Sequence, residues 1–94
     1  MATAMWKSAV IAEGNDTEIV EGNVYFAPSL VQQALLRPST KTTTCPWKGE
    51  CNYFDVVVNG EVNADAAWVY RDPKPAAAQV KNRVAFWRGV EVKR

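Results

Sequence analysis

Hydrophobic and polar residues alternate in short runs along most of the chain, and turn-forming residues separate these runs. Alternation with a period of two is typical of β-strands, whose successive side chains point to opposite faces of a sheet. Over residues 6–26, turn-forming residues at 13–16 and 22–23 divide the chain into three short predicted strands. This region therefore predicts consecutive strands joined by tight connections.

The clearest local signal is Asn59-Gly60, which separates the strand-like runs Tyr53–Val58 and Glu61–Tyr70. A type I′ turn needs positive φ at both central residues, and Asn-Gly is the pair that adopts it most readily. These residues predict a β-hairpin. Before it, the polar and β-prone residues 40–44 predict an exposed or edge strand, and residues 84–87 and 90–92 predict one or two closing strands.

Two segments depart from the period of two. Ser29 precedes the run Leu30–Leu36 and Gln32 follows three residues later, which matches a capping box and predicts a short helix ended by Pro38. Pro75 opens a second helical segment as its first residue. Seven or eight short strands with one or two short helices predict a mainly β domain, either a small barrel or two packed sheets.

Length and charge narrow the class of protein. The chain has 94 residues, of which 48% are hydrophobic, so residues 1–94 are expected to form a single domain around one core. The net charge of +1 is not gathered into blocks, which argues against nucleic acid or a membrane surface as the partner. No apolar run approaches the length of a membrane span, and residues 1–6 lack a signal-peptide pattern. We expect a soluble cytoplasmic protein, monomeric or homodimeric.

The sequence contains no histidine and only two cysteines. Without histidine, imidazole base catalysis and every zinc site that needs a histidine ligand are excluded. Cys45 and Cys51 supply half of a tetrahedral zinc shell, and their spacing is not that of a Cys-x-x-Cys redox motif. We expect two free thiols, with a redox pair or a metal site as the alternatives, and neither a metal nor a cofactor.

Four motifs occur in order along the chain, at residues 20–26, 44–49, 65–70 and 83–87. They read VEGNVYF, TCPWKG, DAAWVY and RVAFW. On these motifs the chain resembles, over about residues 6–92, the bacterial and fungal family catalogued as domain of unknown function 427, which is sometimes labelled nucleotidyltransferase-like.

The resemblance implies a mostly β, barrel-like fold of the β-tent or Mss4-like kind, and no activity. Several β-tent relatives hold zinc through two Cys-x-x-Cys pairs, which this sequence lacks, so a metal is not carried over. The nucleotidyltransferase label has no support in the residues. The sequence contains neither a Gly-Ser followed by a spaced pair of aspartates nor a glycine-rich phosphate loop.

Aromatic residues are the main candidates for function, with four tryptophans, three tyrosines and three phenylalanines. They either fill the core or line a pocket whose flat walls hold a planar or sugar-like ligand. Two carboxylates with a possible lysine counter-ion fall inside the same motifs. We therefore predict a small-molecule pocket bordered by Glu21, Asn23, Tyr25, Trp47, Lys48, Asp65, Trp68 and Tyr70.

Other interpretations stay open. Asp65 and Glu21 either form structural hydrogen bonds or ion pairs, or one of them is the general acid/base of a small metal-independent enzyme with Lys48 as electrostatic stabiliser. Cys45 as a nucleophile is a weaker candidate than either carboxylate, because only Lys48 could lower its pKa.

A third class of function is an interaction or homo-oligomerising module that pairs through residues 40–44. Basic residues near Phe86 and Trp87 raise single-stranded nucleic acid as a further partner, against the low net charge.

Overall fold

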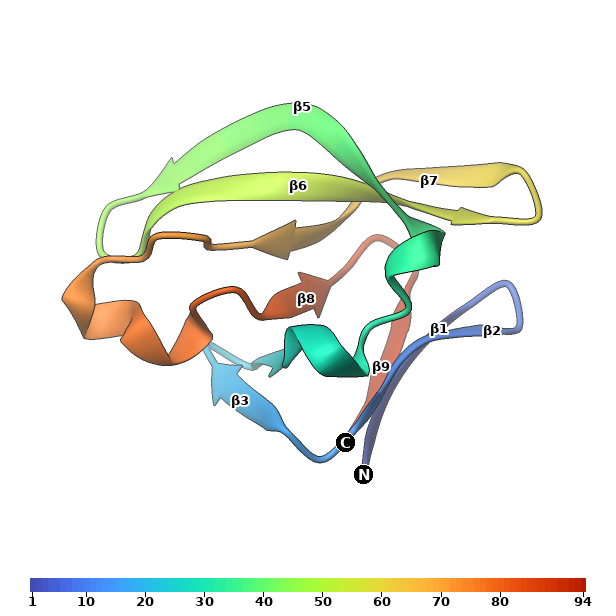
Figure 1. The fold of residues 1–94 in the computed structure, drawn as a ribbon, viewed down its shortest axis with the longest axis horizontal. Coiled ribbons are helices and arrows are strands. Elements are labelled where there is room, and N and C mark those ends of the chain that lie inside the picture. Colours follow the sequence, from blue (N-terminus) through green and yellow to red (C-terminus); the bar gives the residue numbers. More distant parts are fainter.

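Nine strands and three short 3-10 turns make up the computed structural model, which describes residues 1–94 (Figure 1). The strands form two antiparallel sheets, as the mainly β prediction requires. The three-stranded sheet has the order β2-β1-β9, with β1 at Ala2–Trp6, β2 at Ala9–Gly14 and β9 at Glu91–Lys93. Because β1 pairs with β9, the two ends of the chain lie side by side.

The six-stranded sheet has the order β3-β4-β8-β7-β6-β5. Its strands are β3 (Thr17–Val20), β4 (Asn23–Phe26), β5 (Leu36–Cys45), β6 (Gly49–Val58), β7 (Glu61–Val69) and β8 (Val84–Phe86). The 3-10 turns are η1 (Pro28–Leu30), η2 (Gln33–Leu35) and η3 (Pro75–Val80). None of these turns is long and apolar enough to cross a membrane.

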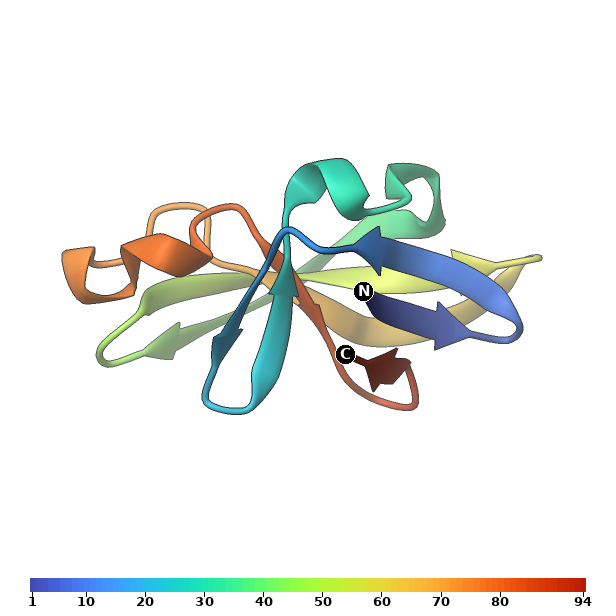
Figure 2. The ribbon, with the colours of Figure 1, turned by 90° about the horizontal axis from the view of Figure 1, so that it is seen from below.

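The two sheets are not closed into a barrel, so the two-sheet form of the prediction is correct and the barrel is wrong. The outer strands of the larger sheet, β3 and β5, pair on one side only. The β1–β2 and β6–β7 hairpins extend toward the same end of the molecule (Figures 1 and 2), where Lys7 Nζ lies 3.8 Å from Glu61 Oε1. The sheets therefore meet through packing rather than through a continuous hydrogen-bonded ladder.

The predicted hairpin and edge strand are both confirmed. Val58 pairs with Glu61, and the two residues between them, Asn59 and Gly60, have φ values of 50° and 79°. That conformation is the type I′ turn expected from the sequence. Residues 40–44 belong to β5, the outer strand of the larger sheet, which bends along its length (Figure 1).

The sequence pattern missed β1, and the reason lies in the turn that follows it. Lys7 and Ser8 connect β1 to β2 with φ values of 51° and 65°. Neither residue type favours positive φ, so the turn has no sequence signal of the Gly or Asn kind. Without that signal, the first predicted strand begins at Trp6 and leaves residues 2–5 unassigned.

The predicted helix over residues 29–36 is wrong. Val31 is extended, with φ −97° and ψ 134°, and it forms a bridge with Ala12 of β2. The Gln32 N–H donates to the carbonyl of Ile11 at 2.8 Å, so tertiary pairing breaks the segment into η1 and η2. Ser29 lies within η1, whose cap residue is Ala27, and no side-chain cap hydrogen bond forms there. The second predicted helix is the 3-10 turn η3, with a proline in its first turn as expected.

The larger sheet buries side chains on both of its faces. On one face, 14 buried residues from both sheets form one cluster, in which the rings of Phe26 and Phe86 meet edge to face with centroids 5.7 Å apart. Because strand side chains alternate, Tyr25 and Ala85 belong to a second cluster. That cluster comprises Tyr25, Cys51, Trp68, Tyr70, Ala77, Val80 and Ala85.

β7 is irregular at Asp65, which has a φ of 55° although it is not glycine. The register between β6 and β7 shifts at the same place, between Phe54 and Val56. The carboxylate of Asp55, which lies within this shift, accepts hydrogen bonds from the Asp65 N–H at 3.0 Å and from Arg37 Nη2 at 2.8 Å. It thereby satisfies an amide that the bulge removes from the ladder.

Replacing Asp55 with Asn is expected to destabilise the domain by about 1–2 kcal/mol at neutral pH, because a charged acceptor is lost. The Asp65 N–H and then Arg37 hold the pKa of Asp55 below its usual 3.8. A lowered pKa contributes stability that is present above the unfolded-state pKa and is lost as the pH falls through the folded-state pKa. The difference between Asp55→Asn and the wild type should therefore shrink in strong acid.

Urea denaturation at pH 7 and at about pH 2 measures this difference. Arg37→Gln is the control: it removes an exposed guanidinium, leaves the Asp65 contact in place, and should cost less than about 1 kcal/mol. An Asp55→Asn penalty of the same size at both pH values would show that Asp55 acts through packing and not through its charge.

Candidate functional site

Neighbouring strands of the larger sheet place aromatic side chains in a row on one face. Trp68 of β7 pairs with Tyr53 of β6 on one side and with Ala85 of β8 on the other. Tyr25 of β4 lies on the other side of Ala85. Because the Ala85 side chain is small, the side chains of Tyr25 and Trp68 can meet across it. Trp68 Nε1 donates to Tyr25 Oη at 3.2 Å, and the two rings are perpendicular with centroids 6.2 Å apart.

Trp87 follows β8 and extends this row. Its ring centroid lies 5.5 Å from that of Trp68 and 6.4 Å from that of Tyr53. Its Nε1 donates to the carbonyl oxygen of Asp65 at 2.6 Å. The irregular backbone of β7 therefore fixes the orientation of Trp87, which nonetheless stays 40% exposed.

Lys48 is the one charged residue that is buried, with 5% of its surface exposed. Its ammonium donates to the Glu21 carboxylate and lies 4.7 Å from the ring centroid of Trp47 and 5.6 Å from that of Tyr70. Burial alone would lower the pKa of Lys48, but Glu21 and the Cys45 thiol outweigh it and raise that pKa. The hydrogen bond from Lys48 lowers the pKa of Glu21. Both partners are therefore ionised at neutral pH.

Two tight turns carry this ion pair. Glu21 and Gly22 connect β3 to β4 with positive φ values of 54° and 80°. Lys48 lies between β5 and β6, where its carbonyl oxygen accepts a hydrogen bond from the Lys74 N–H at 2.8 Å. Lys74 Nζ also donates to the carbonyl of Pro46 at 2.6 Å. The segment that leads into η3 therefore holds the β5–β6 turn in place.

These side chains border a hollow of about 270 Å³. Trp87 is hydrogen-bonded to Asp65, which precedes Trp68 in the chain. The Lys48 ammonium contacts the ring of Tyr70, which follows Trp68. The Trp87 ring and the ion pair therefore lie on opposite sides of Trp68. The residues that border the hollow are Glu21, Asn23, Tyr25, Lys48, Tyr53, Trp68, Tyr70 and Trp87.

Six of the eight residues named from the sequence border this hollow, and two do not. Trp47 is 39% exposed and contacts the Lys48 ammonium without bordering the hollow. The Asp65 carboxylate accepts a hydrogen bond from Ser39 Oγ, while its backbone contacts Asp55 and Trp87. Asp65 is thus a positioning residue, because its carbonyl oxygen orients Trp87. Its side chain is turned toward Ser39 of β5.

Tyr53 and Trp87 border the hollow but were not among the predicted site residues. A signal for Tyr53 was available in the hairpin. Counting outward from Asn59-Gly60 places Tyr53 and Trp68 on the same face of the sheet, and the two-residue irregularity in β7 preserves that face. Trp87 had no such signal, since its orientation depends on a hydrogen bond to the irregular part of β7.

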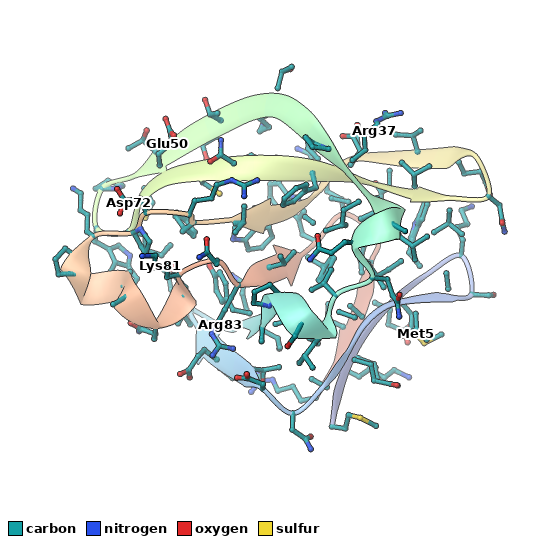
Figure 3. All side chains as sticks on the ribbon, in the orientation of Figure 1. Met5, Arg37, Glu50, Asp72, Lys81 and Arg83 are labelled. Carbon is teal, nitrogen blue, oxygen red and sulfur yellow. The ribbon has the colours of Figure 1, made fainter.

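The basic residues near the C-terminus are partly neutralised by acids. Arg83 Nη2 lies 3.0 Å from Asp16 Oδ1, and Figure 3 shows Arg83 reaching toward β3. Lys93 Nζ lies 3.2 Å from Glu91 Oε1. The guanidinium of Arg88 lies 4.7 Å from the ring centroid of Trp87. Arg83 and Lys93 are therefore paired with acids, whereas Arg88 forms no ion pair and lies on a ring that borders the hollow.

Both cysteines are free thiols, as expected, but their surroundings differ. Burial raises the pKa of Cys51. Burial also acts to raise the pKa of Cys45, but the backbone N–H groups of Lys48 and Trp47 and the Lys48 ammonium outweigh it, so the pKa of Cys45 is lowered. The lysine that the sequence named as the only possible activator of Cys45 does act to lower the pKa of that thiol.

Residues 3–94 match the model of the family described as Domain of unknown function (DUF427). The chain belongs to this family, in agreement with the four sequence motifs. No curated protein matches the chain. The description of the family names no activity.

The lowered pKa of Cys45 predicts that this thiol reacts with iodoacetamide at lower pH than an ordinary cysteine, whose pKa is about 8.5. Cys51 should stay unmodified while the domain is folded. Lys48→Met should move the Cys45 pKa upward, because it removes the positive charge nearby. Alkylation rates followed by mass spectrometry across pH, with Cys51→Ser to isolate Cys45, measure both effects. An ordinary Cys45 pKa in the wild type would contradict the arrangement described.

Proposed function

We propose that this domain is a binding module for a small planar ligand, which lies in the hollow against Trp68 and Trp87. The observation that carries the proposal is that large aromatic side chains surround open space and do not close over it. Protein interiors are normally packed without gaps, and exposed aromatic area forgoes stabilisation of about 25 cal/mol per Å². Trp87 leaves 40% of its surface exposed beside this space.

The hollow is also built on rigid supports, which favours binding. Tyr25, Tyr53 and Trp68 lie on paired strands. The indole N–H groups of Trp68 and Trp87 are both hydrogen-bonded within the protein. Preformed walls reduce the entropy lost when a ligand binds. Lys48 and Glu21 lie together at one side of the hollow, where they can fix the orientation of a ligand.

The same geometry favours binding over acid/base catalysis. Glu21 is ionised and paired with Lys48, which makes it a poor proton donor at neutral pH. Asp65, the other candidate acid/base, is bonded to Ser39 and does not border the hollow. Glu21 is the one carboxylate that borders the hollow. It is therefore the one carboxylate that could act as a general base on a bound substrate, which would need a proton within hydrogen-bond reach of it.

Homo-oligomerisation through β5 is less well supported than ligand binding. β5 is an outer strand, but it contains Pro38 and Lys41, and its pairing with β6 is interrupted between Pro38 and Thr42. A proline, a lysine and an irregular ladder are features that protect edge strands from pairing with another chain.

Titration of the ¹⁵N-labelled domain with indole, a neutral planar probe, tests the proposal. We expect shifts at the indole N–H signals of Trp68 and Trp87 and at amides around the hollow. Trp87→Ala should weaken binding about tenfold or more, because it removes one aromatic wall. Trp6→Phe is the matched control, since Trp6 lies on β1 and does not border the hollow.

Wild-type affinity in the Trp87→Ala variant would contradict the proposal, as would shifts that cluster away from the hollow. Signal dispersion in the same spectra shows whether each variant is folded, so a loss of binding cannot be confused with unfolding.

A further inference from the structure

The two partners of the Lys48–Glu21 ion pair differ sharply in their exposure to solvent. The Lys48 side chain is 6% exposed, whereas that of Glu21 is 53% exposed. Removing an ammonium from water is costly unless an opposite charge accompanies it. An exposed carboxylate at the tip of a turn can return to water at little cost, but Lys48 cannot. Lys48 therefore needs a carboxylate, and Glu21 is one that can be replaced.

The polar groups around the hollow are mostly hydrogen-bond donors. The Lys48 ammonium has three N–H groups, and the Tyr25 hydroxyl accepts from Trp68 while keeping its own proton to donate. Burial raises the pKa of both Tyr25 and Tyr70, so both phenols stay protonated. Apart from the phenol oxygens, Glu21 and the Asn23 amide oxygen are the side-chain acceptors there. Such a hollow suits a ligand that brings acceptor oxygens.

Charge and size narrow the ligand further. Lys48 is the one buried cation at the hollow, so a monocarboxylate that replaces Glu21 keeps this pair neutral, whereas a phosphate dianion leaves one negative charge in excess at Lys48. The other nearby cations, Arg88 and Lys41, lie over the rings of Trp87 and Tyr53. The volume of about 270 Å³ is at the small end of ligand pockets and accommodates one or two rings. Beyond the ion pair lie Trp68, which is 9% exposed, and Trp87, which is 40% exposed, so Trp87 presents most of the ring-binding surface.

Building on the proposed function, we infer that the hollow takes an aromatic monocarboxylate whose carboxylate replaces Glu21 on Lys48 while its ring lies against Trp68 and Trp87. Glu21 is then an internal competitor that occupies the carboxylate position until a ligand arrives. An internal competitor lowers the apparent affinity in proportion to the fraction of molecules in which it is bound. Removing Glu21 should strengthen binding.

Binding of indole-3-carboxylate and of neutral indole to three proteins tests this inference. In the wild type, the carboxylate should bind more tightly than indole. Glu21→Gln should bind the carboxylate about tenfold more tightly than the wild type and indole with unchanged affinity. Glu18→Gln is the matched control: it removes one negative charge from the neighbouring strand β3, outside the hollow, and should change neither affinity appreciably.

The possible failures are distinguishable. If indole binds in the hollow but Glu21→Gln leaves the carboxylate affinity unchanged or weakens it, the replacement of Glu21 is wrong and the proposed function stands. If neither probe binds in the hollow at millimolar concentration, both are wrong. Lys48→Met should abolish the preference for the carboxylate, and the Glu21→Gln comparison remains decisive if that variant does not fold.

Discussion

The burial of the Lys48 ammonium is the constraint on which the site depends. A charge removed from water has to be compensated nearby, and this domain supplies the compensation from separate parts of the chain. Glu21 comes from the β3–β4 turn, Cys45 from the end of β5 and Tyr70 from the residue after β7. Lys74, ahead of η3, fixes the backbone of Lys48. The ion pair therefore links elements that are far apart in the sequence.

The two faces of the larger sheet have different roles: one forms the main core and the other carries the site. One face joins the three-stranded sheet in a well-filled core, where Phe26 and Phe86 interlock. The other face holds a second buried cluster, in which the rings of Tyr25 and Trp68 meet beside the small residue Ala85, and this cluster borders the hollow. Strand alternation makes this division possible, because neighbouring residues of β4 and β8 serve opposite faces.

The sequence was sufficient to predict features with local causes. The Asn59-Gly60 turn, the edge position of residues 40–44 and most of the residues around the hollow follow from turn chemistry, composition and motif positions. Features with tertiary causes were missed. The helix expected at Ser29–Leu36 was replaced by a bridge between Val31 and Ala12. Asp65 was turned away from the hollow by a bulge that no local pattern announces.

The central claim is that the carboxylate on Lys48 can be exchanged for one carried by a ligand. A structure of the domain determined with indole-3-carboxylate bound tests it most directly. The account predicts the ligand carboxylate within hydrogen-bond distance of Lys48 Nζ, the indole ring against Trp68 and Trp87, and the Glu21 side chain turned into solvent. A structure in which Glu21 keeps its bond to Lys48 while the ligand carboxylate lies elsewhere would contradict the account.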